Sequence, residues 1–200
     1  ISSGNLLEAD KLADEFMLVH PYEIKLLKIS GTIKANLKNY VEANNIFTKL
    51  SKLEENPYET YANLGNVYYL QKNYKDAENY FKKSINLNPN FDVPYNGLAL
   101  LSVAKKEFDL GIENFKIALK HNPSSKHTLS NLGNCYKEME MYELALEYYE
   151  KALEIDENFP EAHNNIGFIM RFQNKLTMAI EHFTRAIELC PDYIDAYYNR

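Results

Sequence analysis

One eight-residue pattern returns along this chain at multiples of 34 residues. It reads Tyr-Ala-Asn-Leu-Gly-Asn-Val-Tyr over 61–68 and Leu-Ser-Asn-Leu-Gly-Asn-Cys-Tyr over 129–136. A weaker copy begins at Tyr95, and the sequence His-Asn-Asn-Ile-Gly occupies 163–167. A fixed period of roughly 20–50 residues is typical of repeat proteins, in which one small unit is stacked several times. The chain is therefore expected to fold as an array whose units contact mainly their neighbours.

Five repeats of 34 residues follow one another without insertion. They are numbered one to five and occupy 24–57, 58–91, 92–125, 126–159 and 160–193. Position 8 of every repeat carries a residue with little or no side chain: Gly31, Gly65, Ala99, Gly133 and Gly167. Position 24 is always aromatic: Phe47, Phe81, Phe115, Tyr149 and Phe183. Small residues let two helix backbones approach closely, and the aromatic ring fills the space beside that contact.

Hydrophobic residues recur at helical spacing in both parts of a repeat, and a short polar turn such as 71–73 separates the two parts. We therefore expect one helix over positions 2–14 and a second over positions 18–30 of every repeat. Residues 1–23 are expected to be the second helix of an earlier repeat, with its turn at Gly4-Asn5. Residues 194–200 are expected to begin a sixth repeat.

These residues resemble the tetratricopeptide repeat, in which Leu-Gly, Tyr, Ala-x3-Phe and a terminal Pro occupy these offsets. The resemblance covers essentially the whole chain and rests on several matched positions in five repeats. It implies an all-α fold, a right-handed superhelical solenoid of antiparallel helix pairs. The whole of 1–200 is then expected to be a single solenoid domain.

Composition excludes several classes of partner. The net charge is −6, and no segment carries the basic stripe that nucleic acid or an anionic membrane surface requires. The apolar runs are far shorter than the roughly 20 residues of a membrane span, so no membrane insertion is expected. The two cysteines, Cys135 and Cys190, lie in different repeats, which argues against a disulfide and favours a reducing compartment such as the cytoplasm.

Signals of catalysis are weak, and we expect no enzyme activity, no cofactor and no metal site in this stretch. No two histidines have zinc-hydrolase spacing, and His163 occupies a position that usually packs in the core. Cys135 also occupies a packing position, so a buried thiol is the preferred interpretation over a nucleophile. An acidic stripe at helical spacing is interpreted as a solvated outer face: Glu143, Glu147, Glu150 and Glu154.

The inner face offers the best functional signal. Position 6 is asparagine in repeats two, four and five and at the start of the sixth: Asn63, Asn131, Asn165 and Asn199. An amide side chain both donates and accepts, so it can pair with a peptide backbone of any sequence. This column resembles the asparagine ladder in the superhelical arm of O-linked N-acetylglucosamine transferases, although Ile29 and Gly97 interrupt it. The alternative is that these asparagines only solvate or cap their helices.

Other inner-face positions of the family extend the predicted groove. Its additional residues are Asn66, Asn134, Leu100, Phe168, Tyr69, Arg171 and Phe172. Amide columns with apolar floors between them suit an extended peptide, whose backbone and side chains need different surroundings. The alternative is that some of these residues pack against the next repeat. The family's carboxylate clamp for chaperone tails is disfavoured, because only Lys28 and Asn63 of its five positions match.

The preferred function is a protein-interaction scaffold that binds an extended polypeptide segment in its concave groove. The alternative is the substrate-presenting arm of a larger enzyme, such as a bacterial glycosyltransferase or sulfotransferase. The chain begins at Ile1 without a methionine and ends within a recurring motif at Arg200, which suggests a piece of a longer protein. Self-association through the exposed apolar ends is a further alternative.

Overall fold

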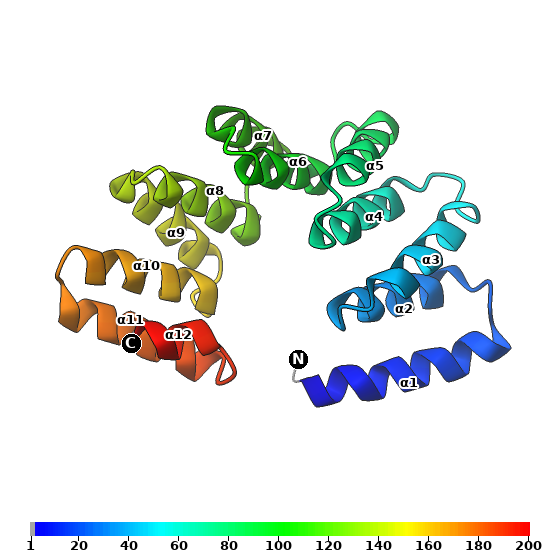
Figure 1. Ribbon diagram of the computed structural model, residues 1–200, viewed down its shortest axis with the longest axis horizontal. Helices are drawn as coiled ribbons and strands as arrows, with labels where there is room; N and C mark the ends of the chain where they lie inside the picture. Colours follow the sequence, from blue (N-terminus) through cyan, green and yellow to red (C-terminus); the bar gives the residue numbers. More distant parts are fainter. Residues whose placement is uncertain (1–2) are drawn as a thin grey trace. The chain divides into compact units, whose positions relative to one another are not determined.

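The computed structural model describes residues 3–200, and its helices are joined by short loops (Figure 1). Among these residues there is no strand. The chain forms two compact parts, an N-terminal half that ends at Leu101 and a C-terminal half that begins at Ser102. The all-α fold predicted from the repeats is therefore confirmed for the described part of the chain.

The helices follow the repeat period. The N-terminal half contains α1 (Ser3–Val19), α2 (Ile24–Asn36), α3 (Tyr40–Ser51), α4 (Tyr58–Leu70), α5 (Tyr74–Leu87) and most of α6 (Asp92–Ala104). The C-terminal half contains α7 (Phe108–His121), α8 (Lys126–Glu138), α9 (Tyr142–Ile155), α10 (Pro160–Phe172), α11 (Leu176–Leu189) and α12 (Ile194–Asn199). Consecutive helices of one repeat, such as α4 and α5, lie side by side as a pair (Figure 1).

Helix boundaries differ slightly from the sequence prediction. The first helix of each repeat begins at position 1 and the second at position 17, one residue earlier than expected. The turn predicted at Gly4-Asn5 is wrong, because both residues lie inside α1. One glycine inside a helix costs only about 1 kcal/mol, and the Leu and Ala residues that follow it favour a helix.

The predicted packing of small residues against aromatic rings is confirmed. A Cβ built on Gly65 would lie 2.5 Å from the ring of Phe81, so no larger residue fits between them. The same close approach occurs between Gly133 and Tyr149, where the distance would be 2.6 Å. The rings at position 24 are almost completely buried: Phe47, Phe81, Phe115, Tyr149 and Phe183. These contacts close each helix pair in the way the repeat pattern requires.

Phe81 packs against two glycines from different repeats. Its ring touches Gly65 on α4 and also Gly97 on α6, where an added Cβ would approach to 2.3 Å. Gly97 stands at position 6, where three other repeats have asparagine. The gap in the asparagine column therefore has a packing cause, since any side chain at Gly97 would collide with Phe81.

In each of the five complete repeats, the first helix is followed at position 15 by a residue in the left-handed conformation. The five residues have φ between 60° and 62° and none is glycine: Lys38, Lys72, Lys106, Glu140 and Asn174. In repeat two, the N–H of Lys72 donates to the carbonyl of Tyr69, and the N–H of Asn73 donates to that of Tyr68 at 2.9 Å. This pair of bonds is a Schellman motif, which satisfies carbonyls that the helix end leaves without partners.

Lys72→Gly is expected to stabilise the protein by about 0.5–1 kcal/mol. A non-glycine residue loses roughly 1–2 kcal/mol in this conformation, and the greater freedom of glycine in the unfolded chain offsets part of the gain. Urea unfolding followed by circular dichroism measures the change. The matched control is Lys82→Gly within α5, which should destabilise by about 1 kcal/mol because that residue is helical. If both substitutions changed the free energy of unfolding equally, the left-handed conformation of Lys72 would be contradicted.

A buried lysine attaches α1 to the helices that follow it. Lys34 on α2 contacts Asp10 and Asp14 of α1 at 3.1 and 2.8 Å, and Glu42 of α3 at 3.2 Å. Only 7% of its side chain is exposed. Burial alone would lower the pKa of Lys34, but the bonds to Asp14, Asp10 and Glu42 outweigh it and the pKa is raised. The ammonium therefore stays charged and links three helices.

Candidate functional site

A cavity of about 910 Å³ lies in the C-terminal half. Its walls come mainly from α8, α10 and α12, the first helices of repeats four, five and six. The residues that line it are Val103, Ala104, Lys106, Phe108, His127, Ser130, Asn131, Asn134, Lys137, Glu138, Phe159, Glu161, Asn164, Asn165, Phe168, Tyr193, Asp195, Tyr198 and Asn199. This volume is in the range of known ligand pockets.

The lining follows helical spacing along α8. His127, Asn131, Asn134 and Lys137 are separated by three or four residues and so lie on one face of the helix. The copies of this face on α10 and α12 follow from the repeat, because equal positions recur 34 residues later. The repeat therefore places three similar helix faces around one cavity.

Three amide oxygens in this cavity already have partners within the protein. The buried hydroxyl of Tyr149 donates to Oδ1 of Asn134 at 2.7 Å. Lys137 Nζ donates to Oδ1 of Asn165 at 3.0 Å, and Nδ2 of Asn199 donates to Oδ1 of Asn164 at 3.0 Å. Since one lone pair of each oxygen is already engaged, the N–H groups make up the larger part of what Asn134 and Asn165 offer to a ligand. The site thus favours groups that accept hydrogen bonds, such as peptide carbonyls.

Lys137 is a cation in a partly apolar setting. Its Nζ lies 5.3 Å from the ring centroid of Phe168, in addition to its bond to Asn165. Burial lowers the pKa of Lys137, because a charged group loses solvation there, while nearby Glu138 opposes the shift.

Aromatic rings form the apolar part of the lining. His127 and Phe159 make an edge-to-face contact with centroids 5.2 Å apart. Phe168 lies on α10, and Tyr193 precedes α12. Burial, followed by the carboxylates of Glu161 and Asp195, raises the pKa of Tyr193. Rings beside oriented donors give a surface that holds both side chains and backbone of a bound peptide.

Five of the predicted groove residues line this cavity: Asn131, Asn134, Asn165, Phe168 and Asn199. Arg171 and Phe172 lie beyond it, at the end of α10. Nη1 of Arg171 donates to the carbonyl of Asn199 at 2.9 Å, and Phe172 packs on Tyr142 with centroids 4.7 Å apart. Arg171 therefore contacts the next repeat, whereas Phe172, which is 65% exposed, contacts the preceding one.

The other four predicted residues, Asn63, Asn66, Tyr69 and Leu100, belong to the N-terminal half and do not line this cavity. Tyr69 packs against Tyr74 of its own repeat, with centroids 5.9 Å apart. Burial raises the pKa of Tyr69, and the nearby Tyr74 raises it further by a smaller amount. Packing within the repeat therefore accounts for Tyr69.

The charged residues at the two ends of these helix faces were not predicted from the sequence. Glu161 and Asp195 occupy position 2, and Lys137 occupies position 12. Position 2 belongs to the inner face of the family pattern, so the same period that located the asparagines could have located these charges. Asn164, at position 5, was not predicted either. It is almost fully buried, and its Oδ1 accepts a hydrogen bond from Nδ2 of Asn199.

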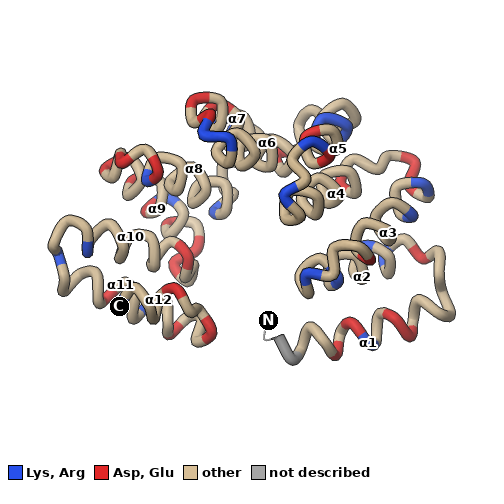
Figure 2. Tube along the Cα trace, in the orientation of Figure 1, with Lys and Arg blue, Asp and Glu red and all other residues tan. Residues whose placement is uncertain are grey.

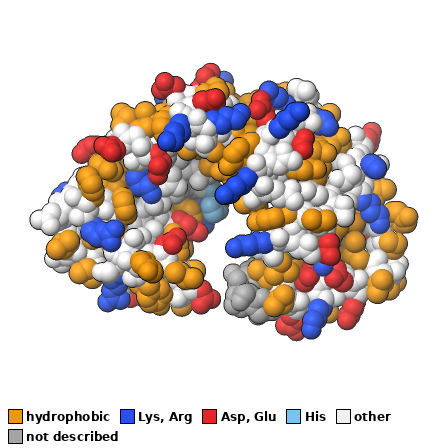
Figure 3. Space-filling model, viewed as in Figure 1, with side chains coloured by type: hydrophobic (Ala, Val, Ile, Leu, Met, Phe, Trp, Pro, Cys, Tyr) orange, Lys and Arg blue, Asp and Glu red, His pale blue; other side chains and the backbone are white. Residues whose placement is uncertain are grey.

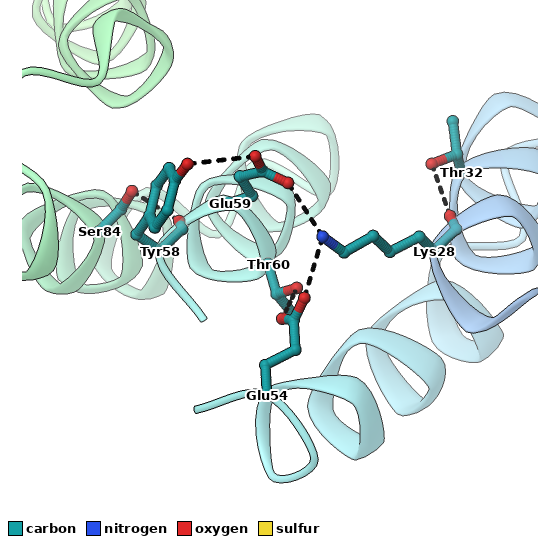
Figure 4. A network of polar contacts seen from close by, with 7 residues as sticks. All are labelled: Lys28, Thr32, Glu54, Tyr58, Glu59, Thr60 and Ser84. Carbon is teal, nitrogen blue, oxygen red and sulfur yellow. Dashed lines mark hydrogen bonds and ion pairs between the residues drawn. The ribbon is translucent and has the colours of Figure 1, made fainter. Parts of the chain in front are cut away.

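A polar network in the N-terminal half uses the one lysine that matches the carboxylate clamp. Lys28 Nζ lies 3.0 Å from both Glu54 and Glu59, and Glu54 also accepts from Thr60 (Figure 4). Hydrogen bonds to Glu54 and Glu59 raise the pKa of Lys28. Because two carboxylates of the protein already hold this ammonium, the network supports the inference that Lys28 is not part of a clamp for a partner's carboxylate.

Cys135 is buried in the core, and His163 has hydrogen-bond partners within the protein. Cys135 is fully buried, and burial raises the pKa of its thiol to about 11, which is the opposite of an activated nucleophile. His163 Nδ1 lies 3.1 Å from Nδ1 of His182, and its Nε2 lies 3.0 Å from the carbonyl of Glu157. Among the described side chains, no three His, Cys, Asp or Glu residues come together as metal ligands would.

The histidine pair predicts an acid-sensitive helix pair α10–α11. Burial first, and His163 second, lower the pKa of His182 below its ordinary 6.5, while Glu181 opposes this shift. The unfolded chain then takes up a proton near pH 6.5 that the folded state resists, so the free energy of unfolding should fall as pH drops below about 6.5. Thermal unfolding between pH 7.5 and 5.5 measures this. His182→Gln should flatten the pH dependence, and an unchanged slope would contradict it.

Charged residues of both signs are spread along the helices, and neither sign forms a continuous tract (Figures 2 and 3). No helix in the part of the chain that the structure describes is long and apolar enough to cross a membrane.

Comparisons with known proteins agree with the repeat period. Models of the tetratricopeptide repeat match residues 58–91 and 128–159, and a further one matches 148–181. A model described as a TPR repeat matches 169–200. A search among curated protein sequences finds no significant match.

Solved structures share the fold. A crystal structure of the APC/C hetero-tetramer Cut9-Hcn1 is similar over 98% of this chain, with a TM-score of 0.81 and 20% identity, and the match spans 39% of that protein's chain. MamA is similar over 80% of this chain and 93% of its own, with a TM-score of 0.60 and 25% identity. YrrB, described as a TPR protein with an unusual peptide-binding site, is similar over 95% and 98%, with a TM-score of 0.57 and 19% identity.

Proposed function

Because this chain belongs to the tetratricopeptide repeat family, we propose that it acts as a scaffold that binds an extended polypeptide segment in the cavity between α8, α10 and α12. A protein-interaction scaffold is the function that this repeat and its structural relatives support. The finer proposal, a groove for an extended peptide, rests on the lining of the cavity.

The observation that carries the proposal is the combination of oriented donors and aromatic rings on three equivalent helix faces. Asn134 and Asn165 present N–H groups because Tyr149 and Lys137 already occupy their oxygens. A peptide in extended conformation repeats its carbonyl groups along its length, and these accept such donors whatever its sequence. Phe168, which is half-buried, supplies apolar surface for its side chains. YrrB, a structural relative with a peptide-binding site, is consistent with this use of the fold.

The double substitution Asn131→Ala with Asn165→Ala is expected to weaken peptide binding about 10-fold. Each lost hydrogen bond contributes roughly 0.5–1.5 kcal/mol, and 1.4 kcal/mol corresponds to a factor of ten in affinity. The probe is a library of random 10-residue peptides selected on the intact protein, with dissociation constants measured by isothermal titration calorimetry.

The matched control is Asn36→Ala with Asn56→Ala, two exposed asparagines of the N-terminal half. It should leave affinity unchanged, and circular dichroism should show the same helical content in all variants. Failure to select any peptide, or equal affinity in the double variant and the parent, would overturn the proposed groove.

A further inference from the structure

The charges that line the cavity separate to opposite ends of its helices. Glu161 and Asp195 stand at position 2, at the start of α10 and α12. We call them the acidic edge. Lys137 stands at the end of α8, and Lys106 lies in the loop after α6. We call these two lysines the cationic edge.

None of these four side chains forms an ion pair within residues 3–200. Lys126 at the start of α8, by contrast, is paired with Asp156. Glu138 also lines the cavity beside Lys137, but it is exposed and makes no ion pair, so the two lysines leave this edge with a net positive charge. The edges therefore act on whatever enters the cavity.

Both carboxylates of the acidic edge influence the same side chain. Each raises the pKa of Tyr193, and Tyr193 also lines the cavity. His127, at position 2 of repeat four, completes this end of the lining. A cationic group of a ligand would be attracted to these carboxylates and would also contact the aromatic rings.

The distance between the edges sets the spacing of complementary charges. Positions 2 and 12 are ten residues apart, which corresponds to about 15 Å along a helix axis. Lys137 and Glu161 stand on the neighbouring first helices α8 and α10, so an offset of about 8–10 Å between the axes adds to this rise. An extended peptide advances roughly 3.3 Å per residue, so it covers the resulting distance of about 17–18 Å in about five or six residues. Between the edges it crosses the donors of Asn134 and Asn165 and the ring of Phe168.

Resting on the proposed function, we infer that the bound segment carries a basic side chain and a carboxylate about five or six residues apart. Glu161 and Asp195 receive the basic side chain, and Lys137 with Lys106 receives the carboxylate. Lys137 keeps its bond to Asn165 and donates its remaining N–H groups to the incoming carboxylate. The carboxylate comes from an acidic side chain or from the C-terminus of the partner.

The test uses 10-residue synthetic peptides, otherwise Ala, Ser and Tyr, that carry one Arg and one Glu separated by one to eight residues. Fluorescence anisotropy with the intact protein should give the tightest binding at a separation of about five or six residues. Changing the Glu of the best peptide to Gln should weaken binding about 10-fold. Two further peptide sets distinguish the two sources of the carboxylate. One set keeps Glu and has an amidated C-terminus. The other lacks Glu and ends in a free carboxylate at the same separation from Arg.

Charge reversal on the protein completes the test. Lys137→Glu should weaken the best peptide at least 10-fold, and replacing the peptide's Glu with Lys should restore much of the loss. Lys137→Met checks the same point without adding a charge, and Lys116→Glu on the exposed face of α7 is the control that should have no effect. Thermal unfolding confirms that each variant is folded.

The outcomes separate the two proposals. Peptides that bind equally well without charges, or at every spacing, overturn the charge-spacing inference and leave the peptide groove standing. Peptides that bind only through the acidic edge overturn the role of Lys137. If no peptide in the set or in the random library binds, both proposals fail.

Discussion

Phe81→Ala is expected to lower the free energy of unfolding of the N-terminal half by about 3–5 kcal/mol. The ring is completely buried and lies against Gly65 of α4 and Gly97 of α6. Neither glycine has a side chain that can move into the space, so the substitution leaves a cavity as well as removing apolar surface. Urea unfolding followed by circular dichroism gives the total loss, and hydrogen exchange should show it in α4, α5 and α6.

The matched control is Phe16→Ala on α1, where the side chain is 58% exposed. That substitution should change the free energy of unfolding by about 0.5 kcal/mol or less. A loss below about 1 kcal/mol for Phe81→Ala would contradict the packing described for repeats two and three. A second variant, Phe81→Leu, should keep the fold and lose less, since it fills part of the space.

Lys34→Met is expected to release α1 from the N-terminal half, at a cost of about 1–3 kcal/mol for the lost bonds to charged groups. Methionine keeps the apolar stem but leaves Asp10, Asp14 and Glu42 without their shared cation. Of these, Asp10 is mostly buried, so its carboxylate loses most. Hydrogen exchange should show faster exchange in α1 than in α4 or α5.

Lys82→Met provides the comparison, because its ion pair with Glu78 is an exposed pair within one helix. Such pairs contribute about 0.3–0.5 kcal/mol, so this variant should unfold almost like the parent. If Lys34→Met and Lys82→Met give equal losses and α1 exchanges normally in both, the three-carboxylate contact does not hold α1 in place.

Much of the fold could be predicted because the 34-residue period places the same residue types at the same packing sites. The glycine at position 8 and the ring at position 24 meet in the structure as the pattern indicates. The start of α1 was wrongly predicted, because the repeat period places a turn at Gly4-Asn5 whereas both residues are helical. The left-handed residue at position 15 was also hidden, because lysine, glutamate and asparagine occupy a site where glycine would be the usual signal.

The site was predictable in part. Counting by 34 identified Asn131, Asn165 and Asn199, which the structure brings to one cavity. Counting could not show that Lys137 and Tyr149 already occupy two of the amide oxygens, because those contacts join residues at unrelated repeat positions. It also could not separate Phe168, which lines the cavity, from Phe172, which packs on Tyr142.

The ring of Phe81 also bears on how the array unfolds. In a linear repeat protein, stability is approximately the sum of a term for each repeat and a coupling term for each junction. Phe81 belongs to the interior of repeat two through Gly65 and to its junction with repeat three through Gly97. The same side chain therefore contributes to both terms, and fraying of repeat two removes the support of α6 at the same moment. We therefore expect α4, α5 and the N-terminal part of α6 to unfold together, and partially unfolded forms that separate α5 from α6 to be rare.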